Sequence, residues 1–220
     1  MTRYALSLLA SAFLTVPGFG ATDLFDGFAP GWRERWEEKR FFTKPTVYEV
    51  TTENGRSVLH ASSRGSHGGL VRRLTVETPT SARVRWQWRI ERPLETNTRE
   101  RTRGGDDFAA HVMVIFEDSV LPFRTRALNY VWAAHEPVGS IYPSPYSRNV
   151  GMCVLRSGRA SAGQWVSETR DLVADYLAYF GEMPHRISGV AVLVDTDNTG
   201  LEADAWFAAL ALETSPPVKF

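Results

Sequence analysis

Residues 81–90 alternate strictly between apolar and polar side chains, and this pattern constrains the fold more than any other part of the sequence. Successive side chains of a β-strand point to opposite faces, so the alternation predicts a strand with one buried and one polar face. The apolar set expected in the core is Val84, Trp86, Trp88 and Ile90, and the polar set on the opposite face is Arg83, Arg85, Gln87 and Arg89.

Similar alternation elsewhere predicts an all-β fold. Further strands are expected at residues 46–52, 57–62, 69–76, 107–117, 126–134, 150–156, 164–170, 187–195 and 203–213. Turn-forming residues separate these segments. One helix is expected at Leu172–Phe180, with Asp171 capping its first amides and Gly181 suited to its left-handed end. About ten strands with one short helix indicate an antiparallel β-sandwich of jelly-roll type.

Composition and motifs exclude several classes of protein. The chain has 220 residues with 25 Lys and Arg against 25 Asp and Glu, and a net charge of zero argues against nucleic-acid binding. The one cysteine, Cys153, allows no internal disulfide, and we expect a buried and inert thiol. The sequence contains no G-x-S-x-G, H-E-x-x-H, P-loop or dinucleotide-binding motif, so catalysis has no strong candidate.

Residues 1–20 are typical of a secretory signal peptide. Arg3 provides the positive charge, Tyr4 to Val16 is mostly apolar, and residues 17–21 provide a helix breaker and small residues for cleavage. An apolar stretch of 13 residues is too short to cross a bilayer, and no later segment approaches a membrane span. The sequence therefore predicts a signal peptide at 1–20, a single β-sandwich domain at 21–220, and a periplasmic or secreted protein.

The segment from Asp195 to Gly200, Asp-Thr-Asp-Asn-Thr-Gly, matches the first half of a calcium-binding loop. Asp195, Asp197 and Thr199 would offer oxygens to a structural Ca²⁺, which binds six to eight oxygen ligands. The twelfth position of such a loop, usually Glu, is Trp206. The alternative is a plain hairpin turn joining the strands at 187–195 and 203–213, because the same residues favour turns.

Acidic residues and a histidine lie at the start of the strand at 107–117. Asp106 and Asp107 are adjacent, so they point to opposite faces of an extended chain. Asp107 and His111 share a face and could form an acid–base couple, since imidazole titrates near neutral pH. The alternative is a hydrogen-bonded histidine with a structural role.

The polar face of the strand at 81–90 could bind an acidic polysaccharide. Guanidinium groups such as Arg85 bind carboxylates or sulfates, and amides such as Gln87 bind sugar hydroxyls. We expect the neighbouring strand to add Asp107 and His111, and aromatic side chains nearby to stack on sugar rings. The candidates for stacking are Tyr142, Tyr146 and Trp132. The alternatives are a solvated row of charges and, for Trp132, a place in the core.

Five short motifs resemble, as a series, a bacterial exported family catalogued as domain of unknown function 3047. They are Gly105-Asp-Asp-Phe108, Asn129-Tyr-Val-Trp132, Arg170 with Asp175-Tyr176, Phe180-Gly-Glu182 and Asp195-Thr-Asp-Asn-Thr199. The resemblance covers about residues 25–213. It implies a β-sandwich of the kind found in carbohydrate-binding modules and lectin-like domains, and the family has no assigned activity.

The sequence favours an exported carbohydrate-binding-like sandwich that binds a polysaccharide or glycan on a polar concave face. Hydrogen bonds are expected from Arg85, Gln87, Asp107, His111 and Asn129, stacking from Trp132, and a structural Ca²⁺ at Asp195, Asp197 and Thr199. The alternative is a polysaccharide-cleaving enzyme, a glycoside hydrolase or lyase, on the same scaffold.

Overall fold

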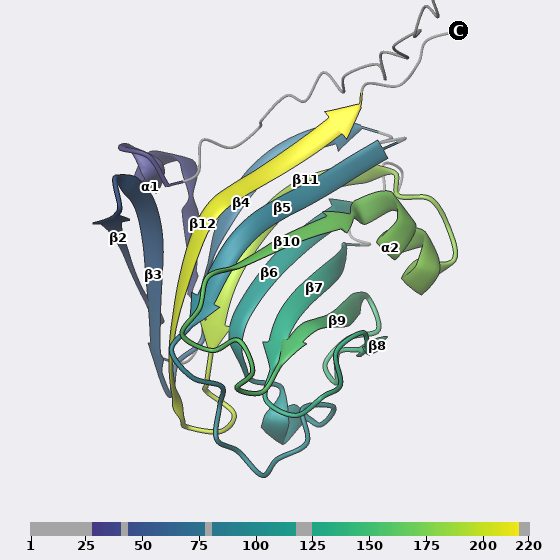
Figure 1. The fold of residues 1–220 in the computed structure, drawn as a ribbon. Coiled ribbons are helices and arrows are strands. Elements are labelled where there is room, and N and C mark those ends of the chain that lie inside the picture. Colours follow the sequence, from purple (N-terminus) through teal and green to yellow (C-terminus); the bar gives the residue numbers. More distant parts are fainter. Residues whose placement is uncertain (1–27, 41–43, 78–80, 118–124, 216–220) are drawn as a thin grey trace, which may run out of the picture.

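The computed structural model describes residues 28–40, 44–77, 81–117 and 125–215 (Figure 1). Residues 1–20, where the sequence predicts a signal peptide, lie outside the described residues. Within the described ranges, no helix is both long and apolar enough to cross a bilayer.

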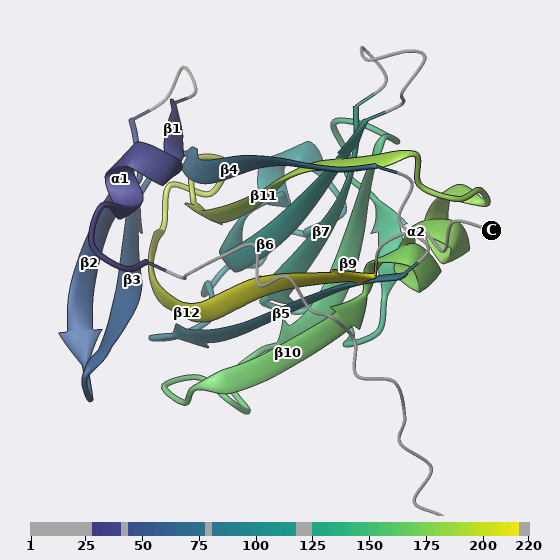
Figure 2. The ribbon, with the colours of Figure 1, turned by 90° about the horizontal axis from the view of Figure 1, so that it is seen from above.

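Two β-sheets pack face to face (Figure 2). The order of strands in the seven-stranded sheet is β1 (Glu37–Arg40), β4 (Gly68–Glu77), β11 (Arg186–Asp195), β6 (Phe108–Glu117), β7 (Arg126–Ala133), β9 (Val150–Ser157) and β8 (Ile141–Pro143). The order in the five-stranded sheet is β10 (Val166–Asp171), β5 (Ser81–Ile90), β12 (Glu202–Ser215), β3 (Arg56–Arg64) and β2 (Val47–Glu53).

The predicted β-sandwich is confirmed. The structure adds three short elements and one parallel strand pair that were not predicted. The sequence did not indicate α1 (Trp32–Arg35), β1 or β8, which are only four, four and three residues long, because such short segments show no periodicity. β7 and β9 pair in parallel, whereas the other strand pairs are antiparallel. The parallel pair arises because the chain leaves β7 and first forms the edge strand β8. It then returns as β9, which lies between β8 and β7.

The core lies between the inner faces of the two sheets. The apolar side chains of β5 are buried there, as the alternation predicts. The rings of Trp88 and Trp132 lie 5.7 Å apart across the core, and those of Trp86 and Tyr130 lie 5.5 Å apart. Cys153 is also buried, and burial raises the pKa of its thiol to about 12, so the prediction of a buried thiol is confirmed.

Helix α2 (Leu172–Phe180) closes one end of the sandwich beside β10 (Figure 1). Asp171 accepts a hydrogen bond from the amide of Ala174, and Gly181 has a φ of 76°, so both predicted caps are confirmed. Asp175 accepts hydrogen bonds at 2.8 Å from the Tyr130 hydroxyl and from Arg170 Nε. These bonds fix the helix to β7 and β10.

Candidate functional site

The topology divides the predicted glycan-binding residues between two opposite surfaces. Arg85 and Gln87 lie on β5 in the five-stranded sheet, whereas His111 and Asn129 lie on β6 and β7 in the seven-stranded sheet. The prediction that β6 neighbours β5 is therefore wrong. The chain crosses from one sheet to the other between these strands, and Asp107 lies at the end of that connection.

Carboxylate and hydroxyl groups pair with the polar row on β5. Arg85 Nε lies 2.8 Å from Glu213 Oε1, and Arg89 Nη2 lies 2.8 Å from Glu53 Oε1. Gln87 Nε2 donates to Ser167 Oγ at 3.0 Å. These contacts bind the polar row to its own sheet.

Two tryptophans on the same surface were missed by the sequence analysis. The Arg89 guanidinium lies 4.3 Å from the ring centre of Trp206 and 5.0 Å from that of Trp165. The His60 ring stacks on Trp206 at 4.9 Å with an interplanar angle of 15°. Trp206 alternates with the buried Ala205 and Phe207, so the period of two could have placed it on the outside. Because neighbouring side chains stack on these rings, the surface fits a structural role better than sugar stacking.

The aromatic residues proposed for stacking on sugars have different environments. Trp132 is only 1% exposed and packs against Trp88 in the core, so it cannot reach a glycan. Tyr142 is buried as well. Tyr146 is 54% exposed, and its hydroxyl donates to Asn198 Oδ1 at 2.8 Å. Of the three candidates, Tyr146 alone presents an aromatic surface to solvent.

A hollow of about 440 Å³ lies on the outer face of the seven-stranded sheet, over β4, β11 and β6. Its apolar floor consists of Gly69, Val71, Met113, Ile115, Ala191 and Leu193, and its polar rim consists of Lys39, Arg73, Glu117, Thr125 and Ser188. His67 lines one end. The volume falls in the range of about 300–1,000 Å³ that is usual for small-molecule sites.

The outer face of the neighbouring strand β7 is covered. Phe108, Val131, Tyr142 and Met152 pack together in a small apolar cluster on this side of the sheet. All outward-facing residues of β7 are buried, namely Ala127, Asn129, Val131 and Ala133. The hollow therefore ends at β6.

The connection between β11 and β12 brings polar groups to the end of the hollow. This segment, Asp195 to Gly200, crosses from one sheet to the other, so the expectation of a hairpin is wrong. Asp107 is buried and accepts hydrogen bonds from the Asn198 and Thr199 amides at 3.3 and 2.7 Å. It also accepts bonds from Asn198 Nδ2 at 2.9 Å and Thr199 Oγ1 at 2.6 Å. Asp107 thus has a structural role and does not pair with His111.

His111 pairs with Asp195. Asp195 Oδ1 lies 2.7 Å from His111 Nε2 and accepts a hydrogen bond from the Phe108 amide at 3.1 Å. Asn129 Nδ2 lies 3.0 Å from the other ring nitrogen of His111. Burial opposes the charge on both members, but their mutual attraction outweighs it, so the pKa of His111 is raised and the pKa of Asp195 is lowered. Each member of the pair therefore favours the charged form of the other.

Asp106 is a perturbed carboxyl group near this pair. Burial, and next the Asp195 carboxylate, raise the pKa of Asp106 to about 7. The Ser144 hydroxyl donates to its Oδ2 at 3.3 Å, and its Oδ1 has no hydrogen-bond partner among the described residues. Asp106 is therefore close to half-protonated at neutral pH, as a general acid needs to be.

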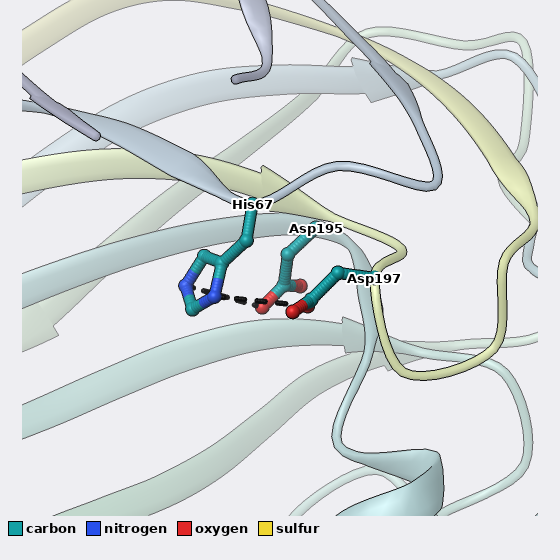
Figure 3. A group of neighbouring side chains, drawn as sticks. All are labelled: His67, Asp195 and Asp197. Carbon is teal, nitrogen blue, oxygen red and sulfur yellow. Dashed lines mark ion pairs between the residues drawn. The ribbon is translucent and has the colours of Figure 1, made fainter. Parts of the chain in front are cut away.

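His67, Asp195 and Asp197 form the one group in the described part of the chain that could hold a metal ion (Figure 3). Their candidate ligand atoms all lie within 4.8 Å of one another. The structure therefore brings Asp195 and Asp197 together, but it binds the Thr199 hydroxyl to Asp107 instead. His67 was not among the predicted ligands, because Gly65-Ser-His-Gly68 has the composition of a turn.

A family model described as "Protein of unknown function (DUF3047)" matches residues 34–211. No curated protein matches the sequence. Among solved structures, the xyloglucanase domain of NopAA from Sinorhizobium fredii, in complex with cellobiose, is 10% identical with a TM-score of 0.43, over 82% of this chain and 93% of that one.

Two further structures are similar at the same low level. A mutant of the family 29 carbohydrate-binding module CBM29-2, complexed with cellulohexaose, is 8% identical with a TM-score of 0.38, over 82% of this chain and 81% of that one. The family 11 xylanase from Neocallimastix patriciarum is 9% identical with a TM-score of 0.40, over 82% and 91%.

Proposed function

This chain belongs to the family of proteins of unknown function DUF3047, and we propose that it binds a glycan in the hollow on the outer face of its seven-stranded sheet. The observation that carries the proposal is the combination of an apolar floor with polar groups at one end. Sugars have apolar ring faces bordered by hydroxyls, so they need both kinds of surface in one place.

A continuous series of contacts joins the hollow to an exposed aromatic ring. His67 lines the hollow and lies 3.6 Å from Asp197 Oδ1. Asn198 follows Asp197 in sequence, and its side chain accepts a hydrogen bond from the Tyr146 hydroxyl. A sugar that extends beyond the end of the hollow would therefore meet carboxylate, amide and phenol groups together.

The proposal includes export to the periplasm or the cell exterior. The support is the predicted signal peptide at residues 1–20. A glycan of the cell envelope or of the surroundings would be the ligand in that compartment.

Binding to a panel of soluble polysaccharides and oligosaccharides, measured by calorimetry, tests the proposal. Tyr146→Ala should weaken binding about 2- to 12-fold, since aromatic contacts contribute about 0.5–1.5 kcal/mol. Val71→Trp should abolish binding, because it places a large side chain on the floor of the hollow.

Val47→Trp is the matched control, since Val47 is exposed on β2 in the other sheet. Arg85→Ala is a second control on that sheet. If either control weakens binding as much as Val71→Trp does, the glycan does not bind in the hollow. If no member of the panel binds, the proposal fails.

The raised pKa of Asp106 favours a second candidate function, cleavage of a polysaccharide. In that case Asp106 would donate a proton to the leaving oxygen of the glycosidic bond, and a water molecule would add to the anomeric carbon. Incubation of the bound polysaccharide with the protein, followed by analysis of products, distinguishes the two functions. Cleavage that is lost in Asp106→Asn while binding is retained would support the enzyme, and an intact polysaccharide would support binding alone.

A further inference from the structure

We infer that His67, Asp195 and Asp197 bind a divalent transition-metal ion of the zinc type at the end of the hollow. The three residues come from two parts of the chain. His67 lies in the turn between β3 and β4, Asp195 ends β11, and Asp197 lies in the connection to β12 (Figure 3).

The distances are close to those of a metal site. His67 Nε2 lies 3.9 Å from Asp195 Oδ2, and His67 Nδ1 lies 3.6 Å from Asp197 Oδ1. Zinc binds nitrogen and oxygen ligands at about 2.0–2.2 Å, which separates tetrahedral ligands by about 3.4 Å. Small side-chain rotations would therefore bring one imidazole nitrogen and two carboxylate oxygens onto one ion.

The environment of Asp195 provides an independent indication of a ligand. Asp195 is only 6% exposed, and its Oδ1 accepts the hydrogen bonds from His111 and from the Phe108 amide. Its Oδ2 faces His67 Nε2 at 3.9 Å. A buried carboxylate is costly unless its charge is compensated, and a cation bound at Oδ2 would offset that cost. Metal sites typically also have residues that do not bind the metal but orient a ligating carboxylate by hydrogen bonds.

The ligand atoms favour zinc or a similar ion over calcium. Calcium takes oxygen ligands, six to eight of them, whereas the site offers an imidazole nitrogen and two carboxylates. The Thr199 oxygen that the sequence assigned to calcium is engaged by Asp107. Three protein ligands leave a coordination position for water or another ligand, as in catalytic zinc sites. Because His67 also lines the hollow, that position would face a bound molecule.

Titration of ZnCl₂ alone into the chelator-treated full chain, followed by calorimetry, tests the inference. We expect saturable, equimolar binding to the wild type. His67→Gln and Asp197→Asn each remove one ligand at a partly exposed residue, and each should weaken zinc binding at least about tenfold. Circular dichroism checks that both variants fold.

The His60–Asp204 pair on the opposite surface provides matched controls, since His60 Nε2 lies 2.9 Å from Asp204 Oδ1. His60→Gln and Asp204→Asn should leave zinc binding unchanged. The absorption spectrum of the wild type with Co²⁺ in place of zinc gives a measurement that does not depend on the variants, and a four- or five-coordinate spectrum is expected.

Three results would overturn the inference. The first is that neither Zn²⁺ nor Co²⁺ binds saturably to the folded wild type. The second is that His67→Gln and Asp197→Asn both bind zinc with wild-type affinity. The third is that the protein binds Ca²⁺ in preference to zinc and that His67→Gln does not change Ca²⁺ binding. Zinc binding requires no glycan, so the failure of either proposal leaves the other to be tested separately.

Discussion

Replacing Asp107 by Ala should weaken the connection between the two sheets. The Asp107 carboxylate accepts four hydrogen bonds, two from backbone amides and two from side chains of Asn198 and Thr199. The variant removes the acceptor and leaves these donors without a partner inside the protein. We therefore expect the segment from Asp195 to Gly200 to lose its position at the start of β6.

The size of the effect follows from the hydrogen bonds. Each bond to a charged group contributes about 1.5–3 kcal/mol, but donors that become hydrated recover part of this. Because Asn198 and Thr199 are partly exposed, we expect the free energy of unfolding to fall by about 3–5 kcal/mol. Urea unfolding at neutral pH, followed by tryptophan fluorescence and circular dichroism, measures this loss.

Asp171→Ala is the matched control. Asp171 accepts one backbone hydrogen bond, from Ala174 at 3.0 Å, as the N-cap of α2. Asp171→Ala should lower the free energy of unfolding by about 1 kcal/mol. If Asp107→Ala costs no more than Asp171→Ala, the four hydrogen bonds do not hold the connection as we describe.

Two more predictions concern titratable groups. The pKa of Asp106 is raised from 3.8 to about 7 in the folded protein, so the folded state binds the proton more tightly than the unfolded state does. The free energy of unfolding should therefore fall as the pH rises from about 4 to about 7. The loss of free energy of unfolding amounts to at most about 4 kcal/mol. Urea unfolding measured from pH 4 to pH 8 should show that Asp106→Asn flattens this decline. The same dependence on pH in the variant as in the wild type would contradict the raised pKa of Asp106. The Cys153 thiol, with a pKa of about 12, should react with a disulfide reagent only as fast as the protein opens; labelling at the rate of a free thiol would show that it is accessible.

The sequence predicted the strands well because most of them bury one face. The alternation in Ser81–Ile90 matches the observed bounds of β5, and the capping residues of α2 are where the sequence places them. Each of these signals is local. A period of two in side-chain polarity follows from strand geometry alone, and a cap follows from the residues next to a helix.

The pairing of strands was not predictable in the same way. Both β5 and β6 have one apolar face, and the pattern does not say whether two such strands share a sheet or face each other across the core. The two strands were expected side by side, whereas they belong to different sheets. The same limit applies to β11 and β12, which were expected to form a hairpin.

The candidate site depends on contacts between residues that are distant in sequence. Asp195 and Asp197 were recognised from their spacing, but their partner His67 lies in another turn. The Asp106 carboxyl group was noticed, but its raised pKa results from burial and from the distant Asp195. Such features appear only when the chain is folded, because no sequence pattern records which loops meet.

The cover over β7 limits how a long molecule can approach the protein. The outward-facing residues of this strand are buried, and among the described residues the hollow is lined from β4, β11 and β6 and not from β7. A glycan in the hollow would therefore contact these three strands and would not lie across the full width of the sheet. Recognition would favour the tip or a side branch of a chain over its middle, and the number of units beyond the first few would matter little.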